Sequence, residues 1–299
     1  MVEVTRVLTA GALNGEGPSW CSERGRLFWI DVRAATLHLF DPATGQDECW
    51  AMPAWIGAYG LTEGGALVAL RTGLYRFELA TGALDFLAPS PCDPRRFFLN
   101  DGTCDPAGRF LVGAMYEPLA PGERQADAPH AAPLWRYDGA GGWEGLTDPV
   151  SVSNGLAWSP DGRTMYHADT KQRLIWAYNY DPPSGAVGGK RVFARVEEGD
   201  GPDGAAVDRD GFYWCAVFGG GCLLRFDPAG RLERRVPVPA RYPTMPAFGG
   251  ADLGTVFVTS ANNPLPPEER LRHPDEGALF AFPAPVPGLP ARLAKPVPR

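Results

Sequence analysis

Six residue pairs, each ending in glycine, recur along this 299-residue chain at intervals of 42 to 53 residues and offer the side chains best suited to chemistry. Four of the six leading residues carry a carboxylate or amide oxygen, and three of these four are anionic. Hard divalent cations prefer carboxylate and amide oxygens, so these side chains would bind a cation if the fold brought them together. The pairs are Glu16-Gly17, Tyr59-Gly60, Asp101-Gly102, Asn154-Gly155, Asp203-Gly204 and Phe248-Gly249.

An alternative interpretation is that each pair is only a turn, because Asp-Gly and Asn-Gly are common turn dipeptides. Glutamate is a poor turn former, however, and all four carboxylate or amide residues precede apolar strands, so we favour the cation site. Two other chemistries lack support. The four histidines have no i, i+4 spacing for a zinc site, and the sequence has no G-x-S-x-G motif of a serine hydrolase.

A repeated pattern follows most of the pairs and predicts the structure that positions them. A few apolar residues come first, then a turn that contains glycine and an apolar strand, and most copies have a second such turn. Two turns of this kind predict hairpins and about four strands per unit. One small sheet cannot bury both of its faces, so the units should close on one another. The sequence therefore predicts an all-β fold, a single six-bladed β-propeller domain over residues 1–299.

A propeller would place the leading residues of the pairs in a ring at one mouth of its central channel, because the innermost strand of every blade runs along the channel. Like charges gathered in such a ring repel one another and are costly to desolvate unless a cation lies among them. We expect Tyr59 and Phe248 to form an apolar wall beside this ring.

Apolar runs predict individual strands in the blades. The segment from Val4 to Leu8 is expected to complete the last blade, as propellers often pair one terminus with the other. A stretch rich in alanine and proline, 118–133, is typical of either a functional lid or a disordered loop. The other expected strands include 27–31, 37–40, 66–70, 73–79, 110–115, 165–168, 213–217, 256–260 and 278–282.

Charge and composition argue against several partners. A net charge of -7 disfavours binding of nucleic acid through a basic surface. The first residues contain no apolar core of signal-peptide length, and no run approaches the roughly 18 apolar residues of a membrane span. We therefore expect a soluble cytoplasmic protein with no membrane contact. The six cysteines form no C-x-x-C pair and are expected to be free thiols. The oligomeric state stays open.

Four motifs, taken together, resemble the regucalcin and gluconolactonase family of sugar lactonases over about residues 10 to 285. Their order and spacing agree with that family, as does the late Phe248-Gly249-Gly250. The motifs are Gly15-Glu16-Gly17-Pro18, Asn100-Asp101-Gly102 followed by Asp105-Pro106-Ala107-Gly108-Arg109, Ser153-Asn154-Gly155-Leu156 and Pro202-Asp203-Gly204. The resemblance implies a six-bladed propeller that opens an aldonolactone or aldarolactone.

The resemblance also implies one divalent cation, held by Glu16, Asn154 and Asp203. Oxygen ligands of this kind fit Ca²⁺, Zn²⁺, Mg²⁺, Mn²⁺ or Fe²⁺ in varying degree, so the identity of the metal stays open. The family's proposed proton donor and acceptor matches Asp203, which is thus the expected catalytic residue.

The expected substrate contacts match the family less closely. Asn100 keeps its match, and Glu117 approximates the acidic contact of the family. The family usually places an arginine two residues before this asparagine, where the present sequence has Phe98. Arg95 and Arg96 lie slightly upstream, and Arg96 is the candidate to reach the substrate through a shifted loop. Because the family's arginine contacts the substrate, Phe98 at this position leaves the identity of the substrate open.

The sequence thus predicts a metal-dependent lactonase whose partner is a small-molecule sugar lactone. Two alternatives remain. One is a propeller that binds a cation or a partner without catalysis, and the other is an esterase or organophosphate hydrolase on a related propeller. Turnover of lactones against aryl esters would separate them.

Overall fold

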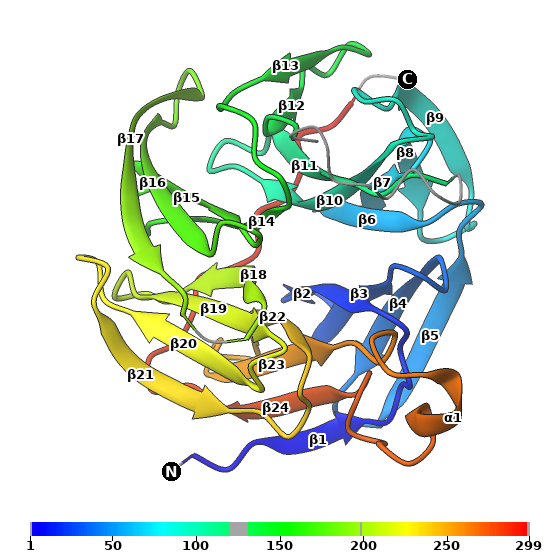
Figure 1. The fold of residues 1–299 in the computed structure, drawn as a ribbon. Helices are drawn as coiled ribbons and strands as arrows, with labels where there is room; N and C mark the ends of the chain where they lie inside the picture. Colours follow the sequence, from blue (N-terminus) through cyan, green and yellow to red (C-terminus); the bar gives the residue numbers. More distant parts are fainter. Residues whose placement is uncertain (1, 120–130, 198, 298–299) are drawn as a thin grey trace.

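Six four-stranded β-sheets surround a central axis in the computed structural model, which describes residues 2–119, 131–197 and 199–297 (Figure 1). The innermost strands contact one another around the axis, and the first of them also contacts the last, so the ring is closed. This confirms the predicted all-β, six-bladed β-propeller. The innermost strands are β2 (Gly15–Cys21), β6 (Ile56–Thr62), β10 (Phe97–Cys104), β14 (Ser153–Trp158), β18 (Gly201–Val207) and β22 (Pro243–Gly249).

The other strands build each blade outwards. The second strands are β3 (Arg26–Asp31), β7 (Gly65–Leu70), β11 (Phe110–Tyr116), β15 (Thr164–Asp169), β19 (Tyr213–Phe218) and β23 (Thr255–Ser260). The third strands are β4 (Thr36–Asp41), β8 (Gly73–Glu78), β12 (Trp135–Tyr137), β16 (Leu174–Asp181), β20 (Cys222–Phe226) and β24 (Leu279–Pro283). The outermost strands are β5 (Gln46–Ala51), β9 (Leu84–Pro89), β13 (Trp143–Gly145), β17 (Ala186–Arg195), β21 (Leu232–Pro237) and β1 (Thr5–Leu8).

Burial follows this order within a blade. All six residues of β14 are buried, whereas β17 at the edge of the same blade has one buried residue. The strands predicted from apolar runs agree with the structure to within about one residue at each end. The six cysteines are free, as expected. A short helix, α1 (Pro267–Arg270), follows β23. No helix within the described ranges is long and apolar enough to cross a membrane.

The last blade is completed by the N-terminus, which confirms another prediction. Strand β1 pairs antiparallel with β24, so the sheet runs β1-β24-β23-β22. Thr5 lies opposite Ala281, and its Oγ1 donates a hydrogen bond to the Ala281 carbonyl at 3.2 Å. The predicted loop 118–133 lies mostly outside the described residues, which end at 119 and resume at 131.

Removal of residues 1–9 is expected to lower the free energy of unfolding by about 3 kcal/mol, since a half-buried Val or Leu contributes roughly 1 kcal/mol. Val4, Val7 and Leu8 are such residues, and they pack on the buried cluster of the last blade. Chemical denaturation measures the change. Removal of residues 1–3 alone is the milder control, and an unchanged midpoint in the longer deletion would show that β1 contributes nothing to closure.

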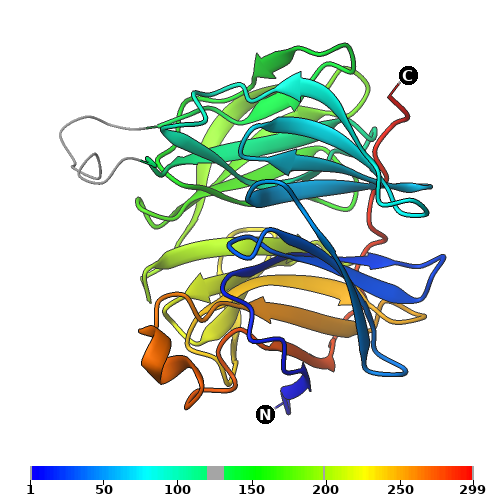
Figure 2. The ribbon, with the colours of Figure 1, turned by 90° about the vertical axis from the view of Figure 1, so that its right-hand side faces the viewer.

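All innermost strands begin at the same end of the channel. Each second strand runs antiparallel to the innermost one and ends there, so Gly15 lies opposite Asp31 and Ser153 opposite Asp169. We call this the Glu16 end. The chain after β24 crosses the opposite end, where Ala294 N donates to Leu61 O at 2.7 Å (Figure 2). A cavity there is lined by all six innermost strands and by 289–292.

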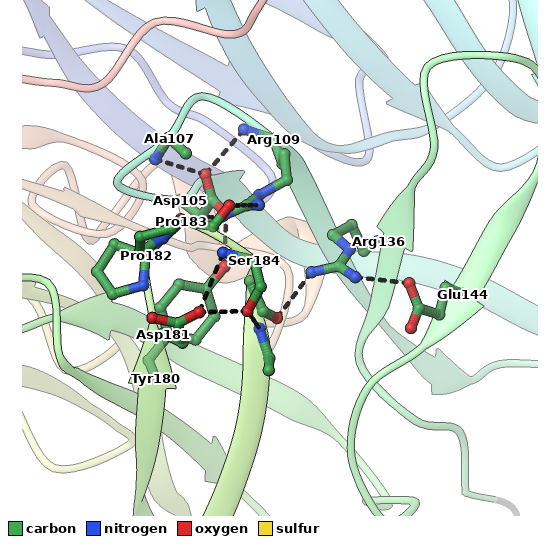
Figure 3. A network of polar contacts seen from close by, with 12 residues as sticks. Asp105, Ala107, Arg109, Arg136, Glu144, Tyr180, Asp181, Pro182, Pro183 and Ser184 are labelled. Carbon is green, nitrogen blue, oxygen red and sulfur yellow. Dashed lines mark hydrogen bonds and ion pairs between the residues drawn. The ribbon is translucent and has the colours of Figure 1, made fainter.

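A buried carboxylate fixes the turns of blades three and four at that opposite end (Figure 3). Asp105 is fully buried and accepts hydrogen bonds from Ala107 N at 2.8 Å and from Arg109 N at 2.9 Å. The Tyr180 hydroxyl of β16 donates to the same carboxylate, and Arg109 Nη1 donates to Pro183 O at 3.1 Å. The Asp-Pro-Ala-Gly-Arg motif thus links two blades structurally. It lies at the opposite end of the channel from Glu16.

Candidate functional site

An irregular step in the pairing occurs in every innermost strand. The register shifts after Glu16 in β2, after Asn100 in β10 and after Asn154 in β14. A β-bulge of this kind adds a residue and re-aims neighbouring side chains. Glu16, Asn100 and Asn154 therefore occupy equivalent positions in their strands. The glycine pairs had predicted Asp101 at this position of β10, and the structure has Asn100 there. The other shifts lie between Ile56 and Ala58, Pro202 and Ala205, and Pro243 and Met245.

Backbone conformation supports this alignment. Gly17 has φ 54° and Gly155 has φ 64°, and the residue with the same left-handed conformation in β10 is Asp101, at φ 48°. Glycine adopts this region without cost, and aspartate is among the few other residues that tolerate it. The turned backbone lets Asp101 Oδ2 accept a hydrogen bond from Leu156 N of the next blade at 3.0 Å.

The prediction that Tyr59 and Phe248 belong to the same ring was wrong. The shift in β6 leaves Tyr59 beyond Gly57, and the shift in β22 leaves Phe248 beyond Thr244. The Tyr59 hydroxyl donates to Gly17 O at 2.6 Å, so it links two blades. Phe248 lines the cavity at the opposite end of the channel. A hydrophobic residue followed by glycine therefore does not mark the bulge, because the register shifts in β6 and β22 come earlier in the strand.

Three buried carboxylates at the Glu16 end, those of Glu16, Asp101 and Asp203, have raised pKa values. Burial and the Asp203 and Asp101 carboxylates raise the pKa of Glu16 well above its ordinary value. Burial and Asp101 likewise raise the pKa of Asp203, whose residue is 6% exposed. Burial raises the pKa of Asp101 to about 6, although backbone N–H donors oppose the change. Crowded buried acids of this kind gain most from a neighbouring positive charge.

Asn154 is held in one orientation beside these carboxylates. Its Nδ2 donates to Thr170 Oγ1 at 2.8 Å, and its Oδ1 accepts from Asn100 Nδ2 at 3.1 Å. Thr170 Oγ1 in turn donates to Pro202 O at 2.8 Å, next to Asp203. The amide oxygen of Asn154 is therefore the atom that it can offer to a ligand. Thr170 was not predicted, and no motif in the sequence marks it.

The donors at this end fit a hard divalent cation. Two carboxylates, of Glu16 and Asp203, and one oriented amide oxygen, of Asn154, are oxygen ligands of the type that calcium and magnesium prefer. Across the described ranges no three His, Cys, Asp or Glu side chains form a metal-binding group by themselves. The predicted site therefore depends on the Asn154 oxygen as its third protein ligand.

The two other predicted substrate residues lie at the same end of the channel, in neighbouring loops. Glu117 follows β11, and its carboxylate forms an ion pair with Arg33 at 2.7 Å between Oε2 and Nη2. Its backbone N–H donates to Arg96 O at 2.9 Å. The exposed Arg96 side chain lies over the Tyr116 ring, with Cζ 5.6 Å from the centroid. Glu117 is thus already paired, and Arg96 lies at the rim.

Comparison with known proteins agrees with this geometry. Residues 14–262 match the model of the SMP-30/Gluconolactonase/LRE-like region. The chain belongs to this family. It is 38% identical over 280 residues to the 6-deoxy-6-sulfogluconolactonase of Pseudomonas putida, covering 92% of both chains. It is 36% identical over 273 residues to the L-arabinolactonase of Azospirillum brasilense, covering 89% of this chain and 87% of the relative.

A solved structure of the family also matches closely. It is the calcium-binding protein regucalcin from Agrobacterium tumefaciens, with a TM-score of 0.89 and 28% sequence identity. The match covers 99% of the present chain and 98% of the other. The predicted family is thereby confirmed, and the fold is shared over nearly the whole chain.

This SMP-30/gluconolactonase family member places an aromatic residue, Phe98, where an arginine was expected. Phe98 is 1% exposed, and its ring meets the Trp55 ring edge to face, with centroids 6.0 Å apart. Two arginines lie over the same tryptophan, with Cζ of Arg33 4.2 Å and Cζ of Arg71 5.3 Å from its centroid. Both arginines were missed because each stands alone in its loop, outside the glycine pairs.

Proposed function

We propose that this protein hydrolyses a sugar lactone to the open-chain sugar acid, with one divalent cation held by Glu16, Asn154 and Asp203. The observation that carries the proposal is the mutual repulsion of buried carboxylates at the Glu16 end, where the Asn154 amide is held in one orientation. The family supports it, because the relatives from Pseudomonas putida and Azospirillum brasilense are named as lactonases. The regucalcin neighbour, named as a calcium-binding protein, supports the cation.

A bound divalent cation would supply Lewis-acid polarisation of the lactone carbonyl, which lowers the barrier to attack by water. The side chains of the protein provide the remaining chemistry. Asp203 accepts a proton as the water oxygen bonds to the carbonyl carbon. The bond from that carbon to the ring oxygen then breaks, and Asp203 returns the proton to the ring oxygen, which becomes a hydroxyl. A base held near its reacting partner contributes to the rate in this way.

The supporting residues keep this arrangement fixed. Asn100 and Thr170 hold the Asn154 amide from both sides, so that its oxygen stays directed to the ligand. Partners of this kind, which orient a metal ligand without touching the metal, typically matter about 10- to 100-fold in affinity or activity.

Cation binding is expected to strengthen as the pH rises from about 5 to about 8, because protons compete for Glu16, Asp101 and Asp203, whose pKa values are all raised. A raised carboxyl pKa stabilises the folded protein below the ordinary value of about 4, and this stabilisation is lost as the pH rises through the folded pKa. The cation offsets the repulsion that then appears. Its stabilising effect should therefore grow with pH.

The measurement is the unfolding midpoint of cation-loaded minus chelated protein at several pH values. Taking this difference removes contributions that do not involve the cation. His167 makes one such contribution. Burial lowers the pKa of His167 to about 3, so its contribution to stability is lost as the pH falls. A difference that stays constant with pH would contradict the raised carboxyl pKa values as the cause.

The experiment that tests the proposed function follows acid release from five- and six-membered sugar lactones and from phenyl acetate, with spontaneous hydrolysis subtracted. We expect turnover of at least one lactone well above that of the aryl ester. Turnover of the ester alone would favour an esterase, and binding of a cation without turnover of either would favour a non-catalytic propeller.

A further inference from the structure

A cluster of two arginines, one tryptophan and one glutamate lies at the Glu16 end, outside the proposed cation ligands. Arg33 follows β3, Arg71 follows β7 and Glu117 follows β11, and each second strand ends opposite the start of an innermost strand. Trp55 precedes β6, and both guanidinium groups lie over its ring. We call these four residues the arginine cluster.

Positive charge exceeds negative charge in the arginine cluster. Arg33 Nη2 pairs with Glu117 Oε2 at 2.7 Å, so the single carboxylate neutralises one guanidinium. Arg71 donates to carbonyls instead: Nε to Pro94 O at 2.7 Å and Nη2 to Glu117 O. The cluster therefore keeps one net positive charge, in a protein whose total charge is -7.

Two guanidinium nitrogens in the cluster are buried without a hydrogen-bond partner among the described residues. They are Arg33 Nε and Arg71 Nη1. The Arg71 residue is 6% exposed. A buried donor left unsatisfied costs free energy, and a charged donor costs more. An acceptor from outside the described residues would therefore remove a cost from two charged groups of the cluster.

The cluster lies within reach of the proposed reaction site. Glu16 pairs with Ile30 of β3, and Arg33 is three residues beyond, a span of at most about 10 Å along the chain. The loop that carries Arg33 is fixed, because buried Asp31 accepts hydrogen bonds from Arg33 N and Ala34 N, both at 3.1 Å. A guanidinium in a fixed loop is preorganised for an anion and loses little entropy on binding.

We propose that Arg33 and Arg71 bind an anionic group, a carboxylate, sulfonate or phosphate, on the part of the sugar lactone remote from its carbonyl. This inference rests on the proposed function, since it names the class of lactone. Planar guanidinium groups match the oxygens of all three anions. Phe98 contributes indirectly, because it packs beneath Trp55, on which both arginines lie.

The test compares kcat/KM for a neutral lactone, D-glucono-1,5-lactone, with that for lactones carrying a carboxylate, a sulfonate or a phosphate at the far carbon. Wild-type protein is expected to favour at least one anionic lactone by about 10-fold or more, the effect of one charged hydrogen bond. The preferred anion identifies the substituent. Arg33→Gln and Arg71→Gln should each lower the ratio of anionic to neutral kcat/KM by about 10- to 100-fold.

Arg231→Gln is the matched control. It removes the same charge from an exposed side chain paired with Asp227, in the turn after β20 at the opposite end of the channel. We expect this variant to keep the wild-type ratio. Equal kcat/KM for neutral and anionic lactones, or an unchanged ratio in both cluster variants, would overturn the inference while leaving the lactonase proposal intact.

Absence of turnover on every lactone would overturn the proposed function instead, and binding would then test the cluster separately. Calorimetric titration with D-glucarate and D-gluconate, which differ by one carboxylate, should show tighter binding of the dianion. That preference should fall in Arg71→Gln, and equal affinities in the wild-type protein would count against the cluster as an anion site.

Discussion

Asp203→Asn is expected to lower kcat for lactone hydrolysis by about 10²- to 10⁴-fold, the range that loss of a positioned acid-base group causes. The amide nitrogen cannot accept the proton of the attacking water. The side chain is nearly buried beside Asp101, and its charge destabilises the cation-free fold, since its pKa is raised well above the ordinary value. The variant should therefore fold at least as stably as the wild-type protein when both are chelated.

Steady-state kinetics on the best lactone measures this effect. Asp210→Asn is the matched control, because the same substitution is then made on an exposed aspartate in the same blade, in the turn between β18 and β19. We expect that control to keep normal turnover. Normal turnover in the Asp203 variant, in contrast, would remove Asp203 from the mechanism.

Glu16→Gln should chiefly weaken cation binding. Loss of a partner that only orients a metal ligand costs about 10- to 100-fold in affinity, so loss of a charged ligand should cost about 100-fold or more. The Glu16 carboxylate is also repelled by Asp203 and Asp101. In chelated protein the glutamine variant should thus be as stable as the wild-type protein or more so, whereas cation should stabilise it much less.

Calorimetric titration and thermal unfolding, each with and without cation, separate these two effects. Glu23→Gln serves as the control, since Glu23 is exposed in the turn at the other end of β2. An unchanged cation affinity in the Glu16 variant would rule out Glu16 as a ligand. A large loss of stability in chelated protein would instead assign Glu16 a structural role.

Much of the fold could be predicted from the sequence, because short-range patterns of apolar residues and glycine turns determine the strands. Apolar strands between glycine turns repeat six times, and a closed ring is the arrangement that buries every blade face. The N-terminal strand followed from the same reasoning. Register at the level of single residues could not be predicted, because each bulge shifts the pairing by one residue and leaves no unique sequence signal. Tyr59 and Phe248 were misplaced for that reason.

The candidate site likewise contains residues that the sequence predicts and residues that it does not. Glu16, Asn154 and Asp203 stand in recognisable motifs at the start of innermost strands, and the Asp203 carboxylate helps to raise the pKa of Glu16. Thr170 and Arg71 act through contacts between blades, which depend on loops with no shared pattern. Contacts across a closed ring join residues far apart in the chain, so single-chain patterns do not reveal them.

The central claim, a cation-dependent lactonase, is tested most directly by removing and restoring the cation. Protein stripped with chelator is assayed for acid release from its best lactone and then titrated with single divalent metals. We predict loss of turnover on chelation and full recovery at one cation per chain, with Asp203→Asn protein recovering little. Undiminished turnover in fully stripped, folded protein would contradict the account.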